Sequence, residues 1–204
     1  MSVSWAVRVA SIRRLLREDW ELLRAIRLEM LADSPLAYLE TLSAARRQTD
    51  TQWQERAAMM SSGSNITLLA DGGADARVRG LMRVALKEPQ EPEQPRRAIL
   101  LSVYVAPAYR GLGLAEELLG EACRVARTEL GAAVLELGVH EDNERAKAFY
   151  LRHGFGFTGE SRPFPQDRSR PKDTAKAGDT VKRELTMERG LSVAQARDSE
   201  GLPH

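Results

Sequence analysis

The sequence predicts a single α/β domain in which a mixed sheet of about six to seven strands is flanked by helices. Two observations carry this prediction. Short alternating or apolar runs, typical of strands, interleave with amphipathic runs of helical spacing, an order that places helices on the faces of one sheet. The 204 residues, 43% of them hydrophobic and 29% charged, suffice for one sizeable core, so a second independent domain is not expected.

The charge balance and the composition exclude several classes of function. The 30 basic and 29 acidic side chains leave a net charge of +1, which gives no support to nucleic-acid binding. No apolar run approaches the ~20 residues of a membrane span, and arginines interrupt the apolar residues near the N-terminus, so we expect a cytoplasmic protein without a membrane partner. The single cysteine, Cys123, and the three scattered histidines predict neither a disulfide nor a metal site.

The first half of the chain is expected to contain a strand, two helices and a hairpin. The strand is predicted at 5–10, the helices at 18–31 and 50–60, and the hairpin strands at 66–70 and 77–86. Ser34-Pro35 closes the first helix, and Thr49 or Asp50 caps the second. In the second hairpin strand, apolar residues alternate with Arg77, Arg79 and Arg83, which predicts one buried and one solvated face. The proline-rich segment 87–97 is predicted to be a loop.

The second half predicts strands that alternate with two further helices. The strands are expected at 98–105, 133–139, 155–158 and 180–187. One helix follows a glycine-rich turn and stops at Gly131, and another runs from an Asn143 cap to Gly154. The segment 161–179 is predicted to be a long loop. The domain is expected to span 1–189, with a disordered tail at 190–204.

A strand, a glycine-rich turn and a helix meet at residues 103–119, and such a junction binds phosphate. Gly111 and Gly113 let the backbone turn sharply and approach a ligand, while the free N–H groups and positive dipole end of the next helix attract negative charge. Arg110 adds a formal charge. The turn is not a dinucleotide fingerprint, which needs glycine where the chain has Glu116, and it lacks the Gly-Lys-Ser/Thr of a P-loop.

A second motif lies about thirty residues farther on: Asn143, Ala146, Phe149-Tyr150 and Gly154-Phe155, spaced as Asn-x-x-Ala-x-x-Phe-Tyr-x-x-x-Gly-Phe. Together with the preceding Val-x-Pro and Arg-Gly-x-Gly-x-Ala, in this order, it resembles the GNAT superfamily of acyl-CoA-dependent N-acyltransferases. The resemblance covers residues 98–160. It implies a GNAT-like fold in which the strands that end at Val105 and Val139 diverge in a V-shaped split.

The resemblance also implies roles for individual residues. Backbone amides of the turn would cradle the pyrophosphate of acetyl-CoA, assisted by Arg110; these residues are Gly111, Leu112, Gly113, Leu114 and Ala115. The pantetheine would pair with the main chain of Val103, Tyr104 and Val105, where a backbone amide would also polarise the thioester carbonyl. Tyr150 would protonate the departing thiolate, and Asn143 would hydrogen-bond the pantetheine arm. From the residues alone, Tyr150 could equally be a core aromatic and Asn143 a helix cap.

The general base and the acceptor pocket are not fixed by the sequence. Many protein-acetylating members have a glutamate where this chain has Ile99, so that base is absent. Glu136, His140 or Glu141 could receive the amine proton through water, or the amine could lose it to bulk solvent. Trp20, Tyr38 and Trp53 could line an acceptor pocket or belong to the core.

The sequence thus predicts an acetyl-CoA-dependent N-acetyltransferase that acts on a primary amine of a small molecule or a protein, by direct attack through a tetrahedral intermediate. A non-catalytic acyl-CoA-binding or sensor module is the alternative. A nucleotide-binding Rossmann-like domain fails on the fingerprint. A homodimer could form by pairing of an exposed strand, 180–187.

Overall fold

The computed structural model describes residues 10–73, 77–88, 93–164 and 182–191. The strand predicted at 5–10 therefore lies almost entirely outside the described residues, as do most of the loop predicted at 161–179 and residues 192–204 of the predicted tail.

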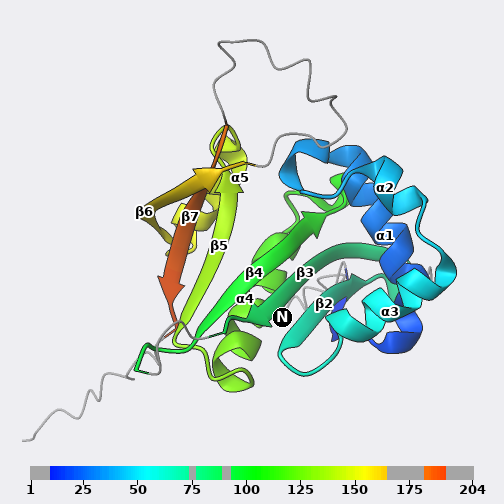
Figure 1. Cartoon of the computed structure of the whole chain (residues 1–204), viewed down its shortest axis with the longest axis horizontal. Coiled ribbons are helices and arrows are strands. Elements are labelled where there is room, and N and C mark those ends of the chain that lie inside the picture. The colour runs from blue at the N-terminus through cyan, green and yellow to red at the C-terminus, as the bar shows by residue number, and fades with distance from the viewer. Residues whose placement is uncertain (1–9, 74–76, 89–92, 165–181, 192–204) are drawn as a thin grey trace, which may run out of the picture.

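The sheet has seven strands in the order β1-β2-β3-β4-β5-β7-β6, as Figure 1 shows. The strands are β1 (Ser11–Arg14), β2 (Asn65–Asp71), β3 (Val78–Leu86), β4 (Arg97–Val105), β5 (Val134–His140), β6 (Gly156–Pro163) and β7 (Arg183–Gly190). All neighbours pair antiparallel except β4 and β5, which are parallel. The helices are α1 (Trp20–Asp33), α2 (Leu42–Arg46), α3 (Asp50–Met60), α4 (Leu114–Thr128) and α5 (Glu144–Arg152). This mixed sheet with helices confirms the predicted fold class.

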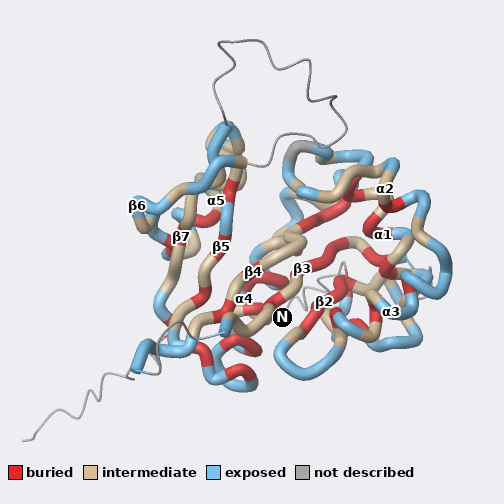
Figure 2. The backbone as a smooth tube through the Cα atoms, viewed as in Figure 1, coloured by how far each residue is buried: buried red, intermediate tan, exposed pale blue. Residues whose placement is uncertain are grey.

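Two hydrophobic cores lie on opposite faces of the sheet. On β2, Leu68 belongs to the core under α4, whereas its neighbour Leu69 belongs to the core under α1 and α3. Because successive strand residues point to opposite faces, α4 covers one face and the N-terminal helices cover the other. Figure 2 shows the buried residues concentrated along β2–β4 and on the helix sides that face them.

The sheet splits between its two parallel strands. β4 and β5 pair only at Arg97↔Val134, Ala98↔Leu135 and Ile99↔Glu136, and beyond these positions they diverge (Figure 1). The V-shaped split expected between the strands that end at Val105 and Val139 is therefore present. It exposes the inner edges of both strands in the middle of the molecule.

Three sequence predictions were wrong. The second hairpin strand, β3, is not solvated on its arginine face, because α1 and α3 cover it and leave Arg79 and Arg83 only partly exposed. β6 runs to Pro163, so residues 161–163 belong to a strand that pairs with β7. β7 itself lies between β5 and β6, so its edges are already paired and the expected dimer contact through 180–187 is not an exposed edge.

Two smaller differences concern the helices and the end of the sheet. The sequence missed the short helix α2, whose N-cap is Thr41. β7 continues to Gly190, and Leu191 is buried in the core under α4, so the first two residues of the predicted tail belong to the folded structure.

We expect Leu118→Ala to destabilise the protein by about 2–5 kcal/mol, because the Leu118 side chain on α4 is fully buried in the sheet core and its loss leaves a cavity. Chemical denaturation measures this loss. Leu151→Ala is the matched control: it removes the same atoms from a half-exposed helix position on α5 and should change stability by only about 0.5 kcal/mol. Equal losses in both variants would contradict the assignment of α4 to the core.

Candidate active site

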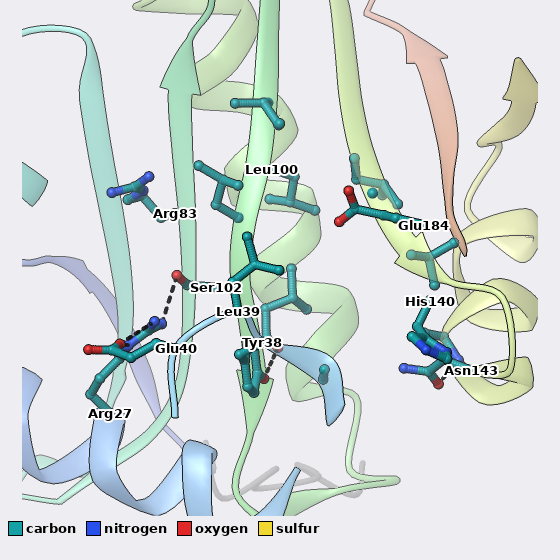
Figure 3. Close-up of a pocket in the computed structure, with 18 of the residues that line it drawn as sticks. Arg27, Tyr38, Leu39, Glu40, Arg83, Leu100, Ser102, His140, Asn143 and Glu184 are labelled. Carbon is teal, nitrogen blue, oxygen red and sulfur yellow. Dashed lines mark hydrogen bonds and ion pairs between the residues drawn. The ribbon is translucent and has the colours of Figure 1, made fainter. Parts of the chain in front are cut away.

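A cavity of about 400 Å³ occupies the split between β4 and β5. Residues from β3 and β4 form one wall, together with parts of α1, α3 and the segment after α1, while β5, α5, β6 and β7 form the other. Figure 3 shows Arg27, Glu40 and Arg83 on the first side and His140 and Asn143 on the second, with Tyr38 between them. The cavity is of a size suited to a small ligand or the end of a longer one.

The β4 wall of the cavity contains a bulge. The register shifts between Leu81 and Arg83 of β3, and opposite this shift Ser102 has a left-handed φ of 53°, the one positive φ among the described non-glycine residues. Bulges and left-handed residues concentrate at functional sites, where they redirect backbone groups. The Ser102 hydroxyl accepts a hydrogen bond of 3.1 Å from Arg27 Nη1, which ties the bulge to α1.

The glycine-rich turn after β4 presents an uncapped helix end. Gly111 and Gly113 have φ values of 79° and 82°, and Gly113 is the N-cap of α4. Gly113 has no side chain with which to cap α4, and no side-chain cap hydrogen bond is present there. The backbone N–H groups of the first turn of α4 therefore remain available to an anion. A side chain added at either glycine would meet no atom within 4 Å, so the cradle is open to solvent. The Leu114 side chain is buried, which leaves only its backbone to face a ligand.

Arg110 is directed away from this turn. Its Nη2 forms an ion pair with Asp33 at the end of α1, and its Nε donates a 2.9 Å hydrogen bond to the carbonyl of Val105. The guanidinium also lies over the Tyr104 ring, 5.7 Å from its centre. Arg110 therefore fixes the turn against α1 and β4, and its contact with a pyrophosphate stays a prediction.

Of the three residues whose main chain is expected to hold a pantetheine, Val103 lines the cavity and Tyr104 and Val105 do not, and two of their carbonyls already accept hydrogen bonds. The Tyr38 hydroxyl donates to Val103 O at 2.7 Å, and Arg110 donates to Val105 O. Each carbonyl keeps a second lone pair. The Tyr104 side chain belongs to the core under α1 and α3, and its hydroxyl donates to Glu29 Oε1 at 3.3 Å.

Tyr150 lines the cavity, although its side chain is 6% exposed. The rings of Phe149 and Phe155 contact it edge-on, with centres 5.4 and 5.5 Å away. Burial, and then the neighbouring Tyr38, raise the pKa of its phenol above the usual value, so the proton stays on the oxygen at neutral pH. The hydroxyl has no hydrogen-bond partner among the described residues. The core interpretation and the functional one are thus compatible: the ring is core and the oxygen faces the cavity.

Asn143 and His140 form the opposite wall. Asn143 Oδ1 accepts a 3.1 Å hydrogen bond from the Ala146 N–H, so it caps α5 as expected, and its Nδ2 is left to face the cavity. His140 Nδ1 accepts a 3.2 Å hydrogen bond from the Asp142 N–H. That bond places the proton of a neutral imidazole on Nε2 and engages the lone pair of Nδ1.

The other two candidate bases do not line the cavity. Glu136 forms ion pairs with Lys87, just after β3, at 2.7 Å and with Arg97 of β4 at 3.1 Å. Burial acts to raise its pKa, but these two cations hold it below its usual range, which makes Glu136 a weak base. Glu141 lies beside Lys182 at 3.8 Å. The cavity is lined instead by Glu184, which the sequence analysis missed.

Glu184 reaches the cavity across a glycine. A side chain on Gly138 of β5 would lie 2.5 Å from the Glu184 carboxylate, so only glycine lets this side chain cross from β7. Glu184 pairs with Arg162 of β6. The strand pairing of β5 and β7 had to be known before this contact could be found.

The first wall carries a cluster of arginines. Glu40 is held by Arg27 through hydrogen bonds of 2.9 and 2.7 Å and by Arg56 through two of 2.7 Å. Arg83 of β3 also lines the cavity. Of the aromatic candidates, Tyr38 lines the cavity, Trp53 is fully buried in the core, and Trp20 packs against that core.

These features accompany a clear family match. The model of the Acetyltransferase (GNAT) family matches residues 29–155, more than half of the chain. The chain belongs to the GNAT acetyltransferase family. Acetyl-CoA is the cofactor of GNAT enzymes, and the open helix end and the split sheet fit such a molecule. A search of curated protein sequences returns no match.

Solved GNAT structures share the fold. An acetyltransferase of the GNAT family from Streptococcus pneumoniae has a TM-score of 0.68 and 18% identity over 88% of this chain and 98% of that one. The structure of yncA from Salmonella typhimurium with its cofactor acetyl-CoA has a TM-score of 0.67 and 18% identity over 93% of this chain and 98% of that one. Spermidine N-acetyltransferase from Vibrio cholerae, in complex with CoA and spermine, has a TM-score of 0.66 and 17% identity over 90% of this chain and 96% of that one.

The described residues contain neither a cluster of metal ligands nor a membrane-spanning helix. No group of three or more histidine, cysteine, aspartate or glutamate side chains there could hold a metal ion. No helix in the same part of the chain has the length and apolarity to cross a membrane.

We expect Gly113→Ala to destabilise this GNAT domain by about 1–2 kcal/mol, because alanine strains at a left-handed φ even though the added methyl group would meet no neighbour. Gly120→Ala is the matched control, since Gly120 lies inside α4 with equal space around it and should gain up to about 1 kcal/mol. Urea denaturation of both variants checks this. A Gly113→Ala protein as stable as the Gly120→Ala protein would show that the left-handed turn is dispensable.

Proposed function

We propose that this protein is an acetyl-CoA-dependent N-acetyltransferase that acts on a primary amine. The observation that carries the proposal is the Tyr150 hydroxyl, which has no partner among the described residues and faces a cavity at the split of β4 and β5. The GNAT family supplies the donor class, and a solved relative is a spermidine N-acetyltransferase.

Acetyl-CoA supplies an activated thioester. The backbone N–H groups from Gly111 to Ala115 would bind its pyrophosphate, since they form an uncapped helix end with a glycine cradle. The inner edge of β4 at Val103, Tyr104 and Val105 would pair with the pantetheine, and Asn143 Nδ2 would donate to the same arm from the other wall.

The residues of the cavity would then lower the barrier in two ways. Backbone amides at the Ser102 bulge would face the thioester carbonyl and stabilise the negative charge that develops on its oxygen, an effect worth ~3–4 kcal/mol per well-placed donor. The amine nitrogen would first bond to the acetyl carbon, and as the carbon–sulfur bond of the resulting tetrahedral intermediate breaks, Tyr150 would give its proton to the departing sulfur. Burial, which raises the pKa of Tyr150, keeps the phenol protonated until the sulfur departs.

The amine proton would leave through water. The Nδ1 lone pair of His140 is engaged, and Glu40 is held by two arginines, so neither is a good base. Glu184 lines the cavity and is paired with one arginine, Arg162, rather than two, so we propose that it receives this proton through a bridging water.

A non-catalytic acyl-CoA sensor is the second candidate, and the observation that favours it is Ile99, which stands where many protein-acetylating relatives have a glutamate base. The two candidates differ in what Tyr150 does.

We expect Tyr150→Phe to lower kcat by about 10²–10⁴-fold and to leave acetyl-CoA affinity within a few-fold, because only the proton donor is lost. Acetyl-CoA-dependent thiol release measures the first quantity and calorimetry the second. Tyr109→Phe is the control, since Tyr109 does not line the cavity and its ring can keep its stacking on Arg79. An unchanged kcat in Tyr150→Phe would refute the assigned role, and absence of turnover with any amine would favour the sensor.

We expect acetyl-CoA and CoA, but not NAD or ATP, to stabilise the wild-type protein in thermal melting. At about 100 times the dissociation constant the gain is ~2.7 kcal/mol, or roughly 5–11 °C for a domain of this size. Gly113→Ala should reduce this shift, whereas Gly120→Ala should keep it. If neither CoA species raises the melting temperature, the phosphate cradle of residues 111–115 is refuted.

A further inference from the structure

The acceptor end of the cavity carries an excess of positive charge. The charged side chains that line the whole cavity, apart from His140, are Arg27, Arg56, Arg83, Arg162, Glu40 and Glu184. Four cations against two anions leave a net charge of +2. On the β5 wall, Arg162 and Glu184 neutralise each other. The excess therefore lies on the wall formed by β3 and the N-terminal helices.

Within that wall, Glu40 neutralises only part of the charge. It receives hydrogen bonds from Arg27, Arg56 and the Gln48 amide, so both carboxylate oxygens are engaged. Burial raises the pKa of Glu40, but the two arginines lower it more strongly, and the carboxylate stays ionised. No capacity is left for a third cation.

Arg83 is that third cation. Among the described residues it contacts no carboxylate: its recorded hydrogen bond runs from Nη1 to Met59 Sδ at 3.8 Å, and its buried Nε has no partner. Burial, and then the nearby Arg27 and Arg56, lower its pKa, which shows that the site disfavours the charge it holds. Arg83 is partly buried, and a partly buried cation without a counter-ion carries a desolvation cost that an anionic ligand would relieve.

The position of Arg83 fits an acceptor rather than the cofactor. Its neighbour Met82 belongs to the core under α4, so the Arg83 side chain points to the opposite face of the sheet, which α1 and α3 cover. The proposed phosphate cradle is the N-terminus of α4. The donor and the arginine cluster thus approach the split from opposite faces, and Figure 3 shows Arg83 across the cavity from Asn143.

We propose that the acceptor is a small amine that also carries a carboxylate, as a free amino acid does, and that Arg83 binds this carboxylate. The proposal rests on the N-acetyltransferase function proposed above. A guanidinium matches a carboxylate with two parallel hydrogen bonds, whereas a polycationic amine would be repelled by the net charge of +2. The cavity of about 400 Å³ also has to accommodate the acetyl end of the donor, which favours a small acceptor.

The test compares pairs of acceptors that differ only in charge. The twenty standard L-amino acids and their C-terminal carboxamides are assayed with acetyl-CoA by thiol release, and their binding is measured by calorimetry in saturating CoA. Spermidine serves as a cationic acceptor. We expect the kcat/KM of the best amino acid to exceed that of its carboxamide by about 10–100-fold, because the free energy of a hydrogen bond to a charged group corresponds to a rate ratio of that size.

Variants then assign the effect to one side chain. Arg83→Gln should abolish most of the preference for acid over amide, because it lowers kcat/KM for the acid far more than for the amide, and Arg83→Lys should restore part of the preference. Arg124→Gln is the matched control: Arg124 is an exposed arginine on α4 that does not line the cavity. Arg83→Gln removes one of several neighbouring cations, so it should fold normally, and melting temperatures verify this.

Each outcome decides the question. If acetyl-CoA binds but no amino acid is bound or acetylated better than its carboxamide, or if Arg83→Gln leaves the ratio unchanged, the carboxylate proposal is overturned and the acetyltransferase proposal stands. Efficient acetylation of spermidine in preference to every amino acid would also overturn it. If no CoA species binds, the proposed function itself fails.

Discussion

The parting of β4 from β5 is the constraint on which the rest of this structure depends. Three residue pairs join the strands, and beyond them the two inner edges face a cavity. Unpaired backbone groups inside a sheet are costly unless something satisfies them. Side chains supply part of the answer: Tyr38 donates to Val103 and Arg110 donates to Val105. The remaining edge of β4 could accept an extended ligand with amide groups, as proposed for the pantetheine of acetyl-CoA.

The bulge at Ser102 follows from the same split. A strand that leaves its partner must turn its backbone, and the extra residue opposite Leu81 and Arg83 provides that turn at the expense of a left-handed φ. The hydrogen bond from Arg27 to the Ser102 hydroxyl fixes the strained residue to α1. β4 and α1, which form the same wall of the cavity, are therefore held together by this contact.

Local patterns predicted the elements that carry local signals. Gly111 and Gly113 indicated a left-handed turn before a helix, the Asn143 cap lies where its spacing predicted it, and the capping box of Thr49 and Gln52 begins α3. The arginine face of β3 was mispredicted, because an alternating strand does not reveal what covers its polar side. Glu184 was missed for a related reason: it reaches the cavity only because β7 pairs with β5 beside Gly138.

Glu40 both stabilises the packing of the N-terminal helices and lines the cavity. One carboxylate binds an arginine from α1 and another from α3, and it lies in the segment that leads to α2. Its removal would leave the buried Arg27 and the partly buried Arg56 without a counter-ion, so the helices depend on it as much as the cavity wall does. The Glu40 carboxylate thus shows that this wall binds a carboxylate through two guanidinium groups. Arg83 is a guanidinium on the same wall without a carboxylate partner among the described residues, so the acceptor's carboxylate would bind it as Glu40 binds Arg27 and Arg56.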